Sequence, residues 1–456
     1  MPPAEQLPKE FRRLVREQLG AEAEALFEAL NQSAPTSIRL NPCKPCPLTP
    51  TGEPIPWHPQ GRYLSERPRF TLRPEFHAGA YYVQEASSML LAEVLRQLLP
   101  QGETLRALDL CAAPGGKTTL LADALPPGSF VLANEVIRSR LPALQHNIWK
   151  WGRSNLHLAS LDPAHFQPLE NFFDLVLVDA PCSGEGLFRK DSDAMQHWSP
   201  QTVAHCAARQ RRILGEAVRL VRQGGWLIYS TCTLNEAENA ENARRLMENF
   251  ELEECPLNFP SGWGLVRRRV GWQCYPHRVR GEGFYFAAFR RKAGGRARLP
   301  KRSPTPPHLK PLSNRESSEP AAFFQQPEGF RFFIDSKGKV VALEEGQVET
   351  ALFVQAVLKR CWVGVQAGKL KGKVFVPGPG LALFGGLSSR LPALDCSLED
   401  SLQYLRGAPL PLEGAPRGWT RIRFAGLTLG WGKALDARLN NYYPKEWRIR
   451  LEGPGG

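Results

Sequence analysis

Residues 108–119 read Leu-Asp-Leu-Cys-Ala-Ala-Pro-Gly-Gly-Lys-Thr-Thr and continue into residues 120–125, Leu-Leu-Ala-Asp-Ala-Leu. The first part has the pattern of a short apolar strand, the middle turns through small residues, and the end has a helical pattern. Adjacent glycines let backbone N–H groups approach a ligand closely at the start of a helix. The stretch therefore predicts a strand, a ligand-binding glycine turn and a helix, although an ordinary tight turn fits the same residues.

Two later apolar segments fit the same sheet, and each ends in a cysteine. They are residues 173–182, Phe-Asp-Leu-Val-Leu-Val-Asp-Ala-Pro-Cys, and residues 225–232, Gly-Trp-Leu-Ile-Tyr-Ser-Thr-Cys. Runs of this kind are buried on both faces of a parallel sheet. Strand and helix patterns alternate around them, which predicts a doubly wound, Rossmann-like α/β core. The expected strands are 105–110, 129–134, 155–160, 173–179, 225–230 and 284–289, and the expected helices are 81–99, 117–125, 138–150, 201–221 and 235–249.

The chain has 456 residues and a net charge of +13, which indicates a polyanionic partner such as nucleic acid. A generally Arg-rich composition would give the same charge. No apolar run approaches the roughly 18 residues of a membrane span, and Met1–Glu5 does not resemble the start of a signal peptide. We therefore expect a cytoplasmic protein without membrane contact, and a monomer. The ten cysteines are spread singly, as in a reducing compartment, and Cys43–Cys46 has no second pair to complete a metal site.

Composition divides the chain into four parts. Residues 1–78 are expected to form a small α+β RNA-binding subdomain, with an amphipathic helix over 9–30, a strand over 36–41 and a Pro-rich stretch up to residue 74. Its Arg39 and Arg73 either touch phosphate or lie on a solvated surface. Residues 79–291 are expected to form the α/β core domain, 292–320 a basic Pro-rich linker, and 321–456 a β-rich domain. The last domain interleaves cations and aromatics, which suits RNA binding, although its aromatics also fit a core. The tail of this domain carries Arg421, Arg423, Trp431, Lys433, Arg438, Asn441, Tyr442, Tyr443, Lys445, Trp447 and Arg448.

A carboxylate follows each of three successive strands of the expected sheet. Glu135 comes after the second strand, about 20 residues past the glycine turn, where dinucleotide-binding folds place the acid that holds ribose hydroxyls. Asp162 and Asp179 follow the third and fourth strands. Each alone fits a helix cap or a surface charge equally well, but three at one edge indicate a nucleoside-like cofactor.

The glycine turn also resembles part of a phosphate-binding loop. Gly116-Lys117-Thr118 matches the end of that motif, and residues 175–179 imitate the acidic strand that holds magnesium. However, the motif needs a glycine where this chain has Cys111, and Pro114 stiffens the turn. An NTPase is therefore the less favoured alternative.

Cys182 and Cys232 each end a strand of one parallel sheet, so both are expected to face the ligand crevice. A lone free cysteine is usually a small buried hydrophobe, but two beside Asp179 suit one reaction. Carbon 5 of a pyrimidine is a poor nucleophile until a thiolate adds at carbon 6, after which it can take a methyl group from a sulfonium donor. A base then removes the carbon-5 proton and the thiolate leaves. The residues thus predict covalent methyl transfer to a pyrimidine.

Three segments together resemble the Sun/Nop-type RNA (cytosine-5) methyltransferases. They are residues 108–119, residues 179–186, Asp-Ala-Pro-Cys-Ser-Gly-Glu-Gly, and residues 229–234, Tyr-Ser-Thr-Cys-Thr-Leu. Residues 82–88, Tyr-Val-Gln-Glu-Ala-Ser-Ser, and 281–286, Gly-Glu-Gly-Phe-Tyr-Phe, extend the similarity. Residues 189–191, Arg-Lys-Asp, and 427–433, Leu-Thr-Leu-Gly-Trp-Gly-Lys, resemble the ribosomal RNA branch of that family. This branch implies a PUA-like C-terminal domain and small-subunit ribosomal RNA as the substrate.

The resemblance implies a role for each matching position. Cys232 would attack the base, Cys182 would help to release the product, and Asp179 would hold the cytosine edge. DNA cytosine methyltransferases instead attack with the Pro-Cys thiol, so the residues alone leave the nucleophile open. S-adenosylmethionine would be lined by Cys111, Ala112, Ala113, Pro114, Gly115, Gly116, Lys117 and Asp179, with Glu135 at its ribose, Asp162 at its adenine and Arg140 as a further contact. Lys190 is a candidate for the substrate side.

Two other functions fit parts of the same pattern. A non-catalytic RNA-binding assembly factor with a vestigial cofactor pocket would also be basic. Amino-methylating enzymes of this fold carry Asn/Asp-Pro-Pro-aromatic where this chain has Asp-Ala-Pro-Cys at residues 179–182. We therefore expect an S-adenosylmethionine-dependent RNA (cytosine-5) methyltransferase.

Overall fold

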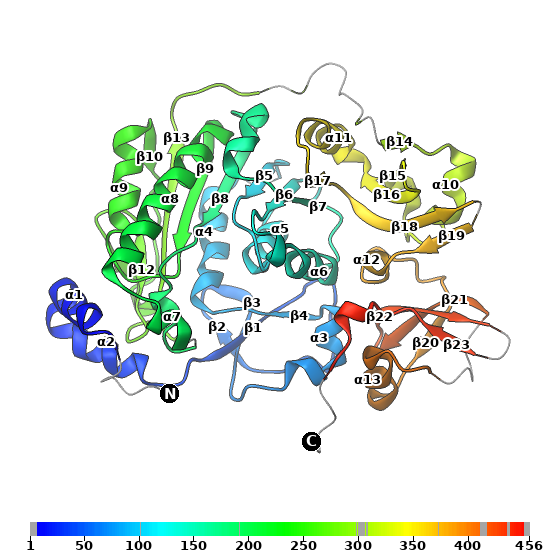
Figure 1. Ribbon diagram of the computed structural model, residues 1–456, viewed down its shortest axis with the longest axis horizontal. Coiled ribbons are helices and arrows are strands. Elements are labelled where there is room, and N and C mark those ends of the chain that lie inside the picture. The colour runs from blue at the N-terminus through cyan, green and yellow to red at the C-terminus, as the bar shows by residue number, and fades with distance from the viewer. Residues whose placement is uncertain are drawn as a thin grey trace.

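The structure, a computed structural model, describes residues 7–100, 102–190, 192–297, 299, 306, 309–372, 374–410, 417–435 and 438–450. Within these residues a central sheet carries helices on both faces, a small sheet lies near the N-terminus, and two more sheets lie in the last third (Figure 1). The predicted class, an α/β core with an α+β N-terminal part and a β-rich C-terminal part, is confirmed.

Five parallel strands of the central sheet lie where the apolar runs predict them. They are β5 (Arg106–Asp109), β6 (Phe130–Asn134), β7 (Leu156–Ala159), β8 (Phe173–Asp179) and β9 (Val221–Thr231). Their spatial order is β9-β8-β5-β6-β7, so the winding reverses between β5 and β8. Ligands in open α/β sheets bind outside the carboxyl ends of the strands at such a reversal. The glycine turn follows β5 at this point.

Antiparallel strands extend the central sheet at both edges, so it is mixed rather than parallel throughout. Beyond β9 lie β13 (Phe284–Arg291), β12 (Trp272–Cys274), β11 (Val266–Arg267) and β10 (Leu252–Glu254). At the other edge β17 (Cys361–Trp362) pairs with β7, Cys361 opposite Ala159 and Trp362 opposite Leu158. The last third of the chain thus contributes a strand to the core.

Helices cover both faces of this sheet (Figure 1). One face carries α4 (Leu90–Leu98), α5 (Gly116–Ala124) and α6 (Leu141–Trp151), and the other carries α8 (Pro200–Leu220) and α9 (Ala240–Asn249). Side chains alternate along a strand. Ala107 therefore packs on the face that carries α4, α5 and α6, and Leu108 packs on the face that carries α8 and α9. Both faces are buried, which explains the continuous apolar runs.

The N-terminal subdomain holds a four-stranded sheet in the order β2-β3-β1-β4. Its elements are α1 (Lys9–Leu19), α2 (Ala23–Leu30), β1 (Thr36–Leu40), β2 (Glu53–Ile55), β3 (His58–Leu64), α3 (Pro74–Ala78) and β4 (Tyr81–Val83). The single helix expected over residues 9–30 is divided at Gly20, whose φ is +57°. β2 and β3 lie in the Pro-rich stretch for which the sequence predicts no strand.

Two expectations for the segment around residue 81 and for Arg39 are wrong. Tyr81–Val83 is a strand that pairs with β1, because its aromatic and β-branched residues fit a sheet, and α4 begins only at Leu90. Arg39 is fully buried instead of facing phosphate or solvent. Arg73 is 41% exposed and pairs with Glu75 at 2.7 Å.

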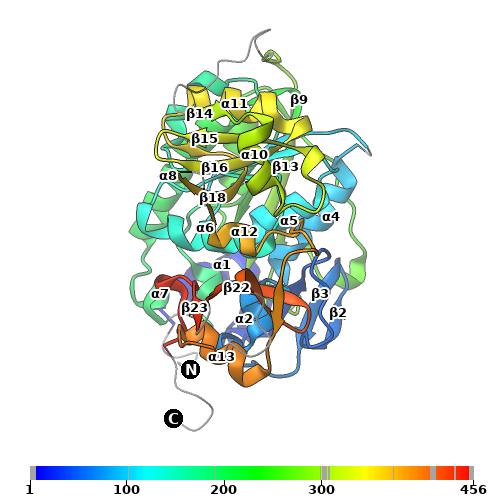
Figure 2. The same ribbon diagram turned by 90° about the vertical axis from the view of Figure 1, so that its right-hand side faces the viewer.

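The last third forms two sheets, which Figure 2 shows one above the other. The five-stranded sheet contains β14 (Leu309–Pro311), β15 (Phe330–Asp335), β16 (Lys339–Glu344), β18 (Val365–Lys371) and β19 (Val374–Pro377). The four-stranded sheet contains β20 (Ala393–Asp395), β21 (Gly418–Phe424), β22 (Leu427–Ala434) and β23 (Leu439–Asn441). Their helices are α10 (Asn314–Ala321), α11 (Val348–Val357), α12 (Pro379–Ala382) and α13 (Leu398–Arg406). β14 and α10 lie inside the stretch expected to be a linker, because Leu309 and Pro311 pair with β15.

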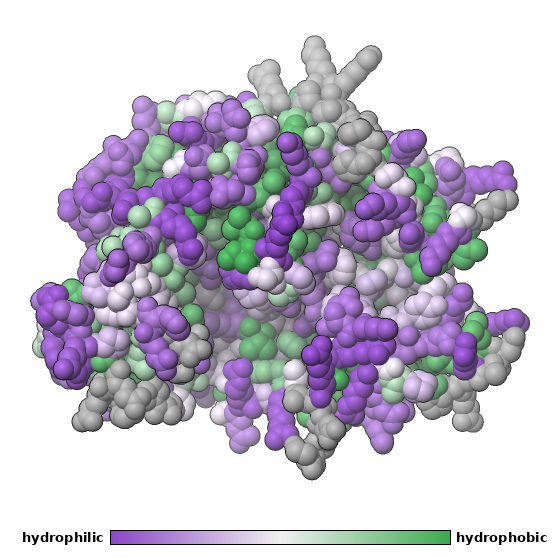
Figure 3. Space-filling model, in the orientation of Figure 1, coloured by the Kyte–Doolittle hydropathy of each residue, from purple (hydrophilic) through white to green (hydrophobic). Residues whose placement is uncertain are grey.

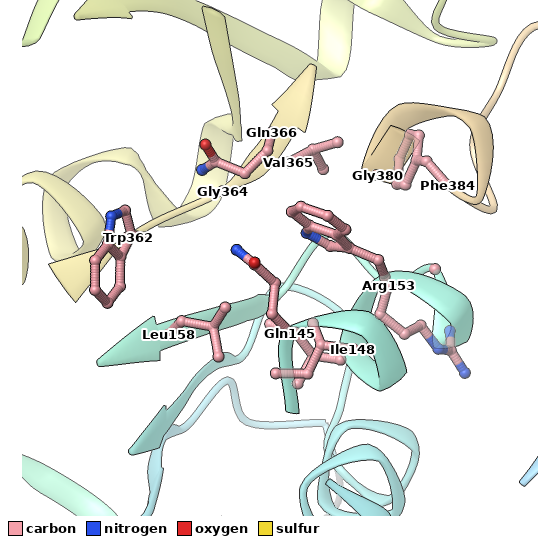
Figure 4. A pocket seen from close by; sticks show the side chains of 13 residues that line it. Gln145, Ile148, Arg153, Leu158, Trp362, Gly364, Val365, Gln366, Gly380 and Phe384 are labelled. Atoms are coloured by element: carbon pink, nitrogen blue, oxygen red, sulfur yellow. The ribbon is translucent and has the colours of Figure 1, made fainter. Parts of the chain in front are cut away.

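The parts of the chain meet closely. The buried Lys44 ammonium donates to the carbonyl oxygens of Ala78 (3.0 Å), Lys150 (2.7 Å) and Leu383 (2.6 Å), which belong to the N-terminal subdomain, the core and the last third. The core and the last third also meet at a second junction, where a cavity of about 20 Å³ is lined from both parts. Figure 4 shows Ile148 and Leu158 of the core beside Trp362, Val365 and Phe384 of the last third. Hydrophilic side chains dominate the face in Figure 3. None of the described helices is long and apolar enough to cross a membrane.

Candidate active site

The two thiols singled out by the sequence meet where β8 and β9 end. These strands are parallel neighbours, with Asp179 opposite Ser230. The Sγ atoms of Cys182 and Cys232 lie 3.0 Å apart, and both side chains are half-buried. The hydrogen bond with Cys232, together with burial, holds the pKa of Cys182 well above its ordinary value. Cys182 therefore keeps its proton at neutral pH.

Glu185, in the loop of Cys182, connects this loop to the loop of Cys232 through hydrogen bonds. Its side chain is buried, with 1% exposure. The carboxylate accepts hydrogen bonds from the Thr233 hydroxyl (2.8 Å) and the Leu234 backbone N–H (2.9 Å). A buried carboxylate needs such donors, and they fix the backbone on which Cys232 sits.

Asn235 joins Glu185 to a second buried carboxylate, Glu238. Its amide donates to Glu185 (3.0 Å) and to Glu238 (2.8 Å). Glu238 in turn accepts the backbone N–H of Ser183 (2.9 Å), next to Cys182. Both cysteine-bearing loops are thus tied to one polar network.

Gly186 tests how tightly these loops are packed. A Cβ at this position would lie 2.6 Å from the carbonyl oxygen of Cys232 and 2.7 Å from that of Gly283. Gly186→Ala is expected to lower methyl transfer at least tenfold and to destabilise the fold by about 1–3 kcal/mol, because backbone must move. Gly215→Ala is the control, since its Cβ meets only a Phe250 ring atom at 3.8 Å. The methyl-transfer rates and thermal unfolding of both variants test this prediction, and full activity of Gly186→Ala would contradict it.

Asp179 lies at the end of β8 and connects the thiol edge to the glycine turn. Its carboxylate accepts hydrogen bonds from Lys117 Nζ (2.8 Å) and from the Ser230 hydroxyl (2.9 Å). Burial opposes the charge of Lys117, but the Asp179 carboxylate outweighs it and raises the Lys117 pKa. Lys117 is consequently charged at neutral pH.

The predicted glycine turn runs from Cys111 to Lys117 and lines a cavity of about 180 Å³. Gly115 is the N-cap of α5 with a φ of +111°, a conformation that favours glycine. Burial raises the pKa of the Cys111 thiol, so it stays protonated. The cavity lining consists of Tyr82, Val83, Gln84, Glu85, Ser88, Cys111, Ala112, Ala113, Pro114, Gly116, Lys117 and Asp179.

Asp109 lies beneath the turn and is fully buried. Its Oδ2 accepts the Thr118 hydroxyl at 2.6 Å, whereas its Oδ1 has no hydrogen-bond partner. Burial raises its pKa from 3.8 to about 7. Because the folded-state pKa is the higher one, the stability from this group is complete below about pH 4 and is lost as the pH rises to about 7.

The pH dependence of unfolding should therefore change in Asp109→Asn. The wild-type protein is expected to lose on the order of 4 kcal/mol of stability from this group between about pH 4 and pH 7. The variant has no titrating group there, so its melting temperature should fall less over that range. Thermal unfolding at several pH values measures this, and parallel curves for the two proteins would contradict it.

Glu135 and Arg140 lie on the far side of the turn. Glu135 is 3% exposed, and its Oε1 accepts the backbone N–H of Ile137 at 2.7 Å. Arg140 donates to the Ala113 carbonyl oxygen (2.6 Å) and lies 3.4 Å from Glu135. Arg140 therefore supports the turn directly.

Asp162 is less close to the turn than the other two carboxylates. It caps the residues after β7 by accepting the Ala164 backbone N–H (3.1 Å), and it pairs with Arg212 of α8 at 3.0 Å. The Arg212 hydrogen bonds lower its pKa. Asp162 lines a second cavity, of about 620 Å³, whose lining also includes Val136, Arg138, Val357, Lys359 and Arg360.

Lys190 lies near the turn that follows the Pro-Cys motif. Its ammonium is 3.4 Å from the buried Glu282, which also accepts Arg189 Nε at 2.9 Å. The structure thus brings Lys190 to a carboxylate of its own chain.

Sequence reasoning missed several groups at this site. The sequence predicts no role for Glu185 or Glu238. Gln84 and Ser88, like Glu185, belong only to segments that resemble the family, and Gln84 and Ser88 line the cavity. The pairing of β4 with β1 places them there. Among the described residues no group of three or more metal-ligand side chains gathers.

In the last domain two aromatics that were candidates for RNA stacking are core residues. Trp431 is 2% exposed and donates to the Gly378 carbonyl oxygen (2.9 Å), and Tyr443 is 4% exposed. Tyr442 remains 45% exposed. It packs on Trp419 with ring centroids 4.6 Å apart, and Lys433 lies over that Trp419 ring.

Three family descriptions match successive parts of the chain. "16S rRNA methyltransferase RsmB/F" matches residues 96–290, "N-terminal domain of 16S rRNA methyltransferase RsmF" matches residues 7–86, and "Methyltransferase RsmF PUA domain" matches residues 392–449. The predicted methyltransferase core and PUA-like domain are thereby confirmed. In chain order they cover the N-terminal sheet, most of the central sheet and the four-stranded sheet, whereas the five-stranded sheet lies outside these three matches.

Relatives and solved structures agree with these matches. Ribosomal RNA small subunit methyltransferase F of Cronobacter sakazakii is 31% identical, with 96% of each chain covered, and that of Klebsiella pneumoniae is 33% identical over 86% of this chain and 84% of the relative. A methyltransferase homologue from Pyrococcus horikoshii has a TM-score of 0.54 and 28% identity over 62% of this chain and 95% of its own. NSun6 from Pyrococcus horikoshii, solved with SFG, has a TM-score of 0.55 and 21% identity over 64% of this chain and 100% of its own, which shows the shared fold. The chain therefore belongs to the RsmB/F family of S-adenosylmethionine-dependent 16S rRNA methyltransferases.

Proposed function

We propose that this protein methylates carbon 5 of a cytosine in 16S rRNA through a covalent adduct with Cys232. The observation that carries the proposal is the 3.0 Å approach of the two thiols at the strand edge that also carries Asp179. Family membership supplies the substrate RNA, and the paired thiols favour cytosine-5 chemistry over amino methylation. Cys232 is the nucleophile in this proposal because it stands at the Thr-Cys position, whose thiol attacks the base in the family that the chain resembles. The raised pKa of Cys182 suits a thiol that assists release.

The residues of the glycine turn fit S-adenosylmethionine. The donor carries a positive sulfonium, and the Asp179 carboxylate lines the cavity beside the turn. Glu135 Oε2 lies 3.4 Å from Arg140 Nη1. We propose residues 111–117 and Asp179 as the main lining, with Glu135 and Arg140 at the ribose side and Asp162 at the adenine side. When bound, the donor supplies an electrophilic methyl group.

The chain's own residues then account for the other steps. The Cys232 thiolate forms a bond to carbon 6 of the cytosine, and the electron pair moves to carbon 5, which takes the methyl group. Asp179 holds the base edge from the end of β8. A base then accepts the carbon-5 proton, the carbon 6–sulfur bond breaks, and the thiolate is regenerated. Cys182, in contact with Cys232, assists this release.

The target cytosine has to leave any helix to reach these groups, since the thiolate attacks the face of the ring. The basic last domain and the N-terminal subdomain are proposed to hold the surrounding RNA. Lys190 is proposed as a substrate contact that exchanges Glu282 for phosphate. A net charge of +13 supports such contacts through salt-dependent phosphate binding.

Transfer of labelled methyl groups tests this function. The wild-type protein is mixed with unmethylated 16S rRNA, or with small subunits, and labelled S-adenosylmethionine, and the modified nucleoside is identified. We expect 5-methylcytosine, and we expect none from the Cys232→Ser control. Tight RNA binding without any incorporation would instead support the alternative, a non-catalytic assembly factor.

We also propose that the protein acts as a cytoplasmic monomer built from the four parts 1–78, 79–291, 292–320 and 321–456. Both thiols, Asp179 and the glycine turn come from one chain, which supports a monomer. The pairing of β14 with β15 favours a last part that includes Leu309. Light scattering should give a mass near 50.9 kDa, and twice that value would contradict the monomer.

A further inference from the structure

Arg39 lies in β1 of the N-terminal subdomain, yet its guanidinium is buried behind the glycine turn. The side chain is completely inaccessible to solvent and stacks on Trp151 of α6, with its Cζ 4.2 Å from the ring centroid. A fully buried arginine is rare and needs a partner for each donor. Its partners show what it holds together.

Two of these partners belong to the turn and to the first turn of α5. Arg39 Nη2 donates to the Gly116 carbonyl oxygen (3.2 Å) and to the Thr119 hydroxyl (2.5 Å). Thr119 in turn donates to the carbonyl oxygen of Gly115 (2.9 Å). One edge of the guanidinium therefore fixes the backbone that bounds one side of the cofactor cavity.

Another partner comes from the segment after β4, which lines the same cavity. Arg39 Nε donates to Gln84 Oε1 at 2.9 Å, and Gln84 Nε2 reaches the Ser88 hydroxyl at 3.3 Å. Gln84, Ser88 and Gly116 all line the same cavity. The planar fork of an arginine can hold these two lining segments in a fixed arrangement, whereas a lysine ammonium cannot.

The charge of Arg39 is retained. Burial lowers its pKa to about 10, and Asp123 opposes this shift by accepting Nη1 at 2.9 Å. Arg153 also donates to Asp123, at 2.8 Å, but none of its described hydrogen bonds reaches the turn or Gln84. Arg39 and Arg153 are thus two arginines on one carboxylate, of which Arg39 alone reaches the cavity walls.

We propose that Arg39 is a positioning residue that fixes the two walls of the S-adenosylmethionine cavity, so that the N-terminal subdomain is an integral part of the cofactor site. This inference rests on the proposed cofactor role of residues 111–117. It assigns the subdomain a task in cofactor binding in addition to RNA binding. Its consequence is that cofactor affinity depends on a residue that does not touch the cofactor.

Calorimetric titration of the full-length protein with S-adenosylmethionine, without RNA, tests the proposal. Arg39→Met is expected to raise the Kd about tenfold or more, and Arg39→Lys to give a smaller rise. Arg153→Met, the matched control, should stay within about twofold of wild type. In steady-state assays the Arg39 variants should raise the KM for S-adenosylmethionine more than they lower kcat.

Hydrogen exchange of the cofactor-free protein gives a readout independent of methyl transfer. Amides of residues 116–119 should exchange faster in Arg39→Met than in Arg153→Met. If Arg39→Met does not fold, Thr119→Val, which keeps the side-chain shape but removes the hydroxyl, provides the test, with a smaller rise in Kd and faster exchange expected.

The outcomes separate this inference from the proposed function. A wild-type protein that fails to bind S-adenosylmethionine would overturn the proposed function. A wild-type protein that binds it, together with Arg39→Met or Thr119→Val of unchanged Kd and exchange, would overturn the role of Arg39 alone.

Discussion

Replacing Cys182 by alanine is expected to leave the protein covalently attached to its RNA. Cys232 can still add to carbon 6 of the cytosine and methylation can still follow, but the thiol that contacts Cys232 at 3.0 Å is missing when the adduct has to break down. Multiple turnover should fall by a factor of about 1000 or more, in the range seen when a catalytic group is removed. A protein–RNA band that survives denaturing electrophoresis measures the adduct.

The matched variants define what this result would mean. Cys232→Ala should neither form the adduct nor transfer methyl groups, because the nucleophile is gone. Cys206→Ala, at a half-buried cysteine of α8, should behave like wild type. An adduct with Cys232→Ala and none with Cys182→Ala would show that the two thiols have the opposite roles.

The second large effect is expected at Asp179. Asp179→Asn removes the negative charge that pairs with Lys117 at 2.8 Å and that faces the cofactor cavity. The single-turnover rate of methyl transfer should fall by roughly 100-fold or more, because preorganised charge at the reacting centre is lost. Stability should change little, since Asp179 is 28% exposed.

Asp174 is the control for Asp179 because it lies at the opposite end of the same strand. It is 3% exposed, accepts the Arg106 backbone N–H (2.7 Å) and pairs with Arg222 (2.5 Å). Asp174→Asn should therefore destabilise the fold by about 3 kcal/mol, while the folded fraction keeps its methyl-transfer rate at low temperature. Equal loss of rate in both variants would contradict a role of Asp179 in the reaction.

Much of the core was predictable because its signals are local. The apolar runs that end at Asp179 and at Thr231 are buried on both faces, and such runs read as strands without any knowledge of their neighbours. The turn at Gly115 was predictable from the small residues and the two adjacent glycines between the strand and helix patterns. Since parallel strands share a carboxyl edge, the proximity of Cys182 and Cys232 also followed from the strand pattern alone.

The features that were not predicted depend on distant parts of the chain. Within the described part of the chain, Tyr81–Val83 pairs with β1 alone, more than 40 residues earlier, and the local pattern favoured a helix. The pairing of Asp162 with Arg212 requires α8 to cross beside β7, which no local pattern indicates. Arg39 is basic and therefore looks like a phosphate contact until Asp123 and Trp151 are seen around it.

The pairing of β17 with β7 bears on how the protein is made. Residues 156–159 leave the ribosome long before residues 361–362, so the nascent core has an open strand edge during most of its synthesis. Unpaired edges of this kind invite association with other chains. A fragment that stops after β13 would keep that edge open permanently, and the last third of the chain therefore doubles as a built-in cover that arrives late in translation.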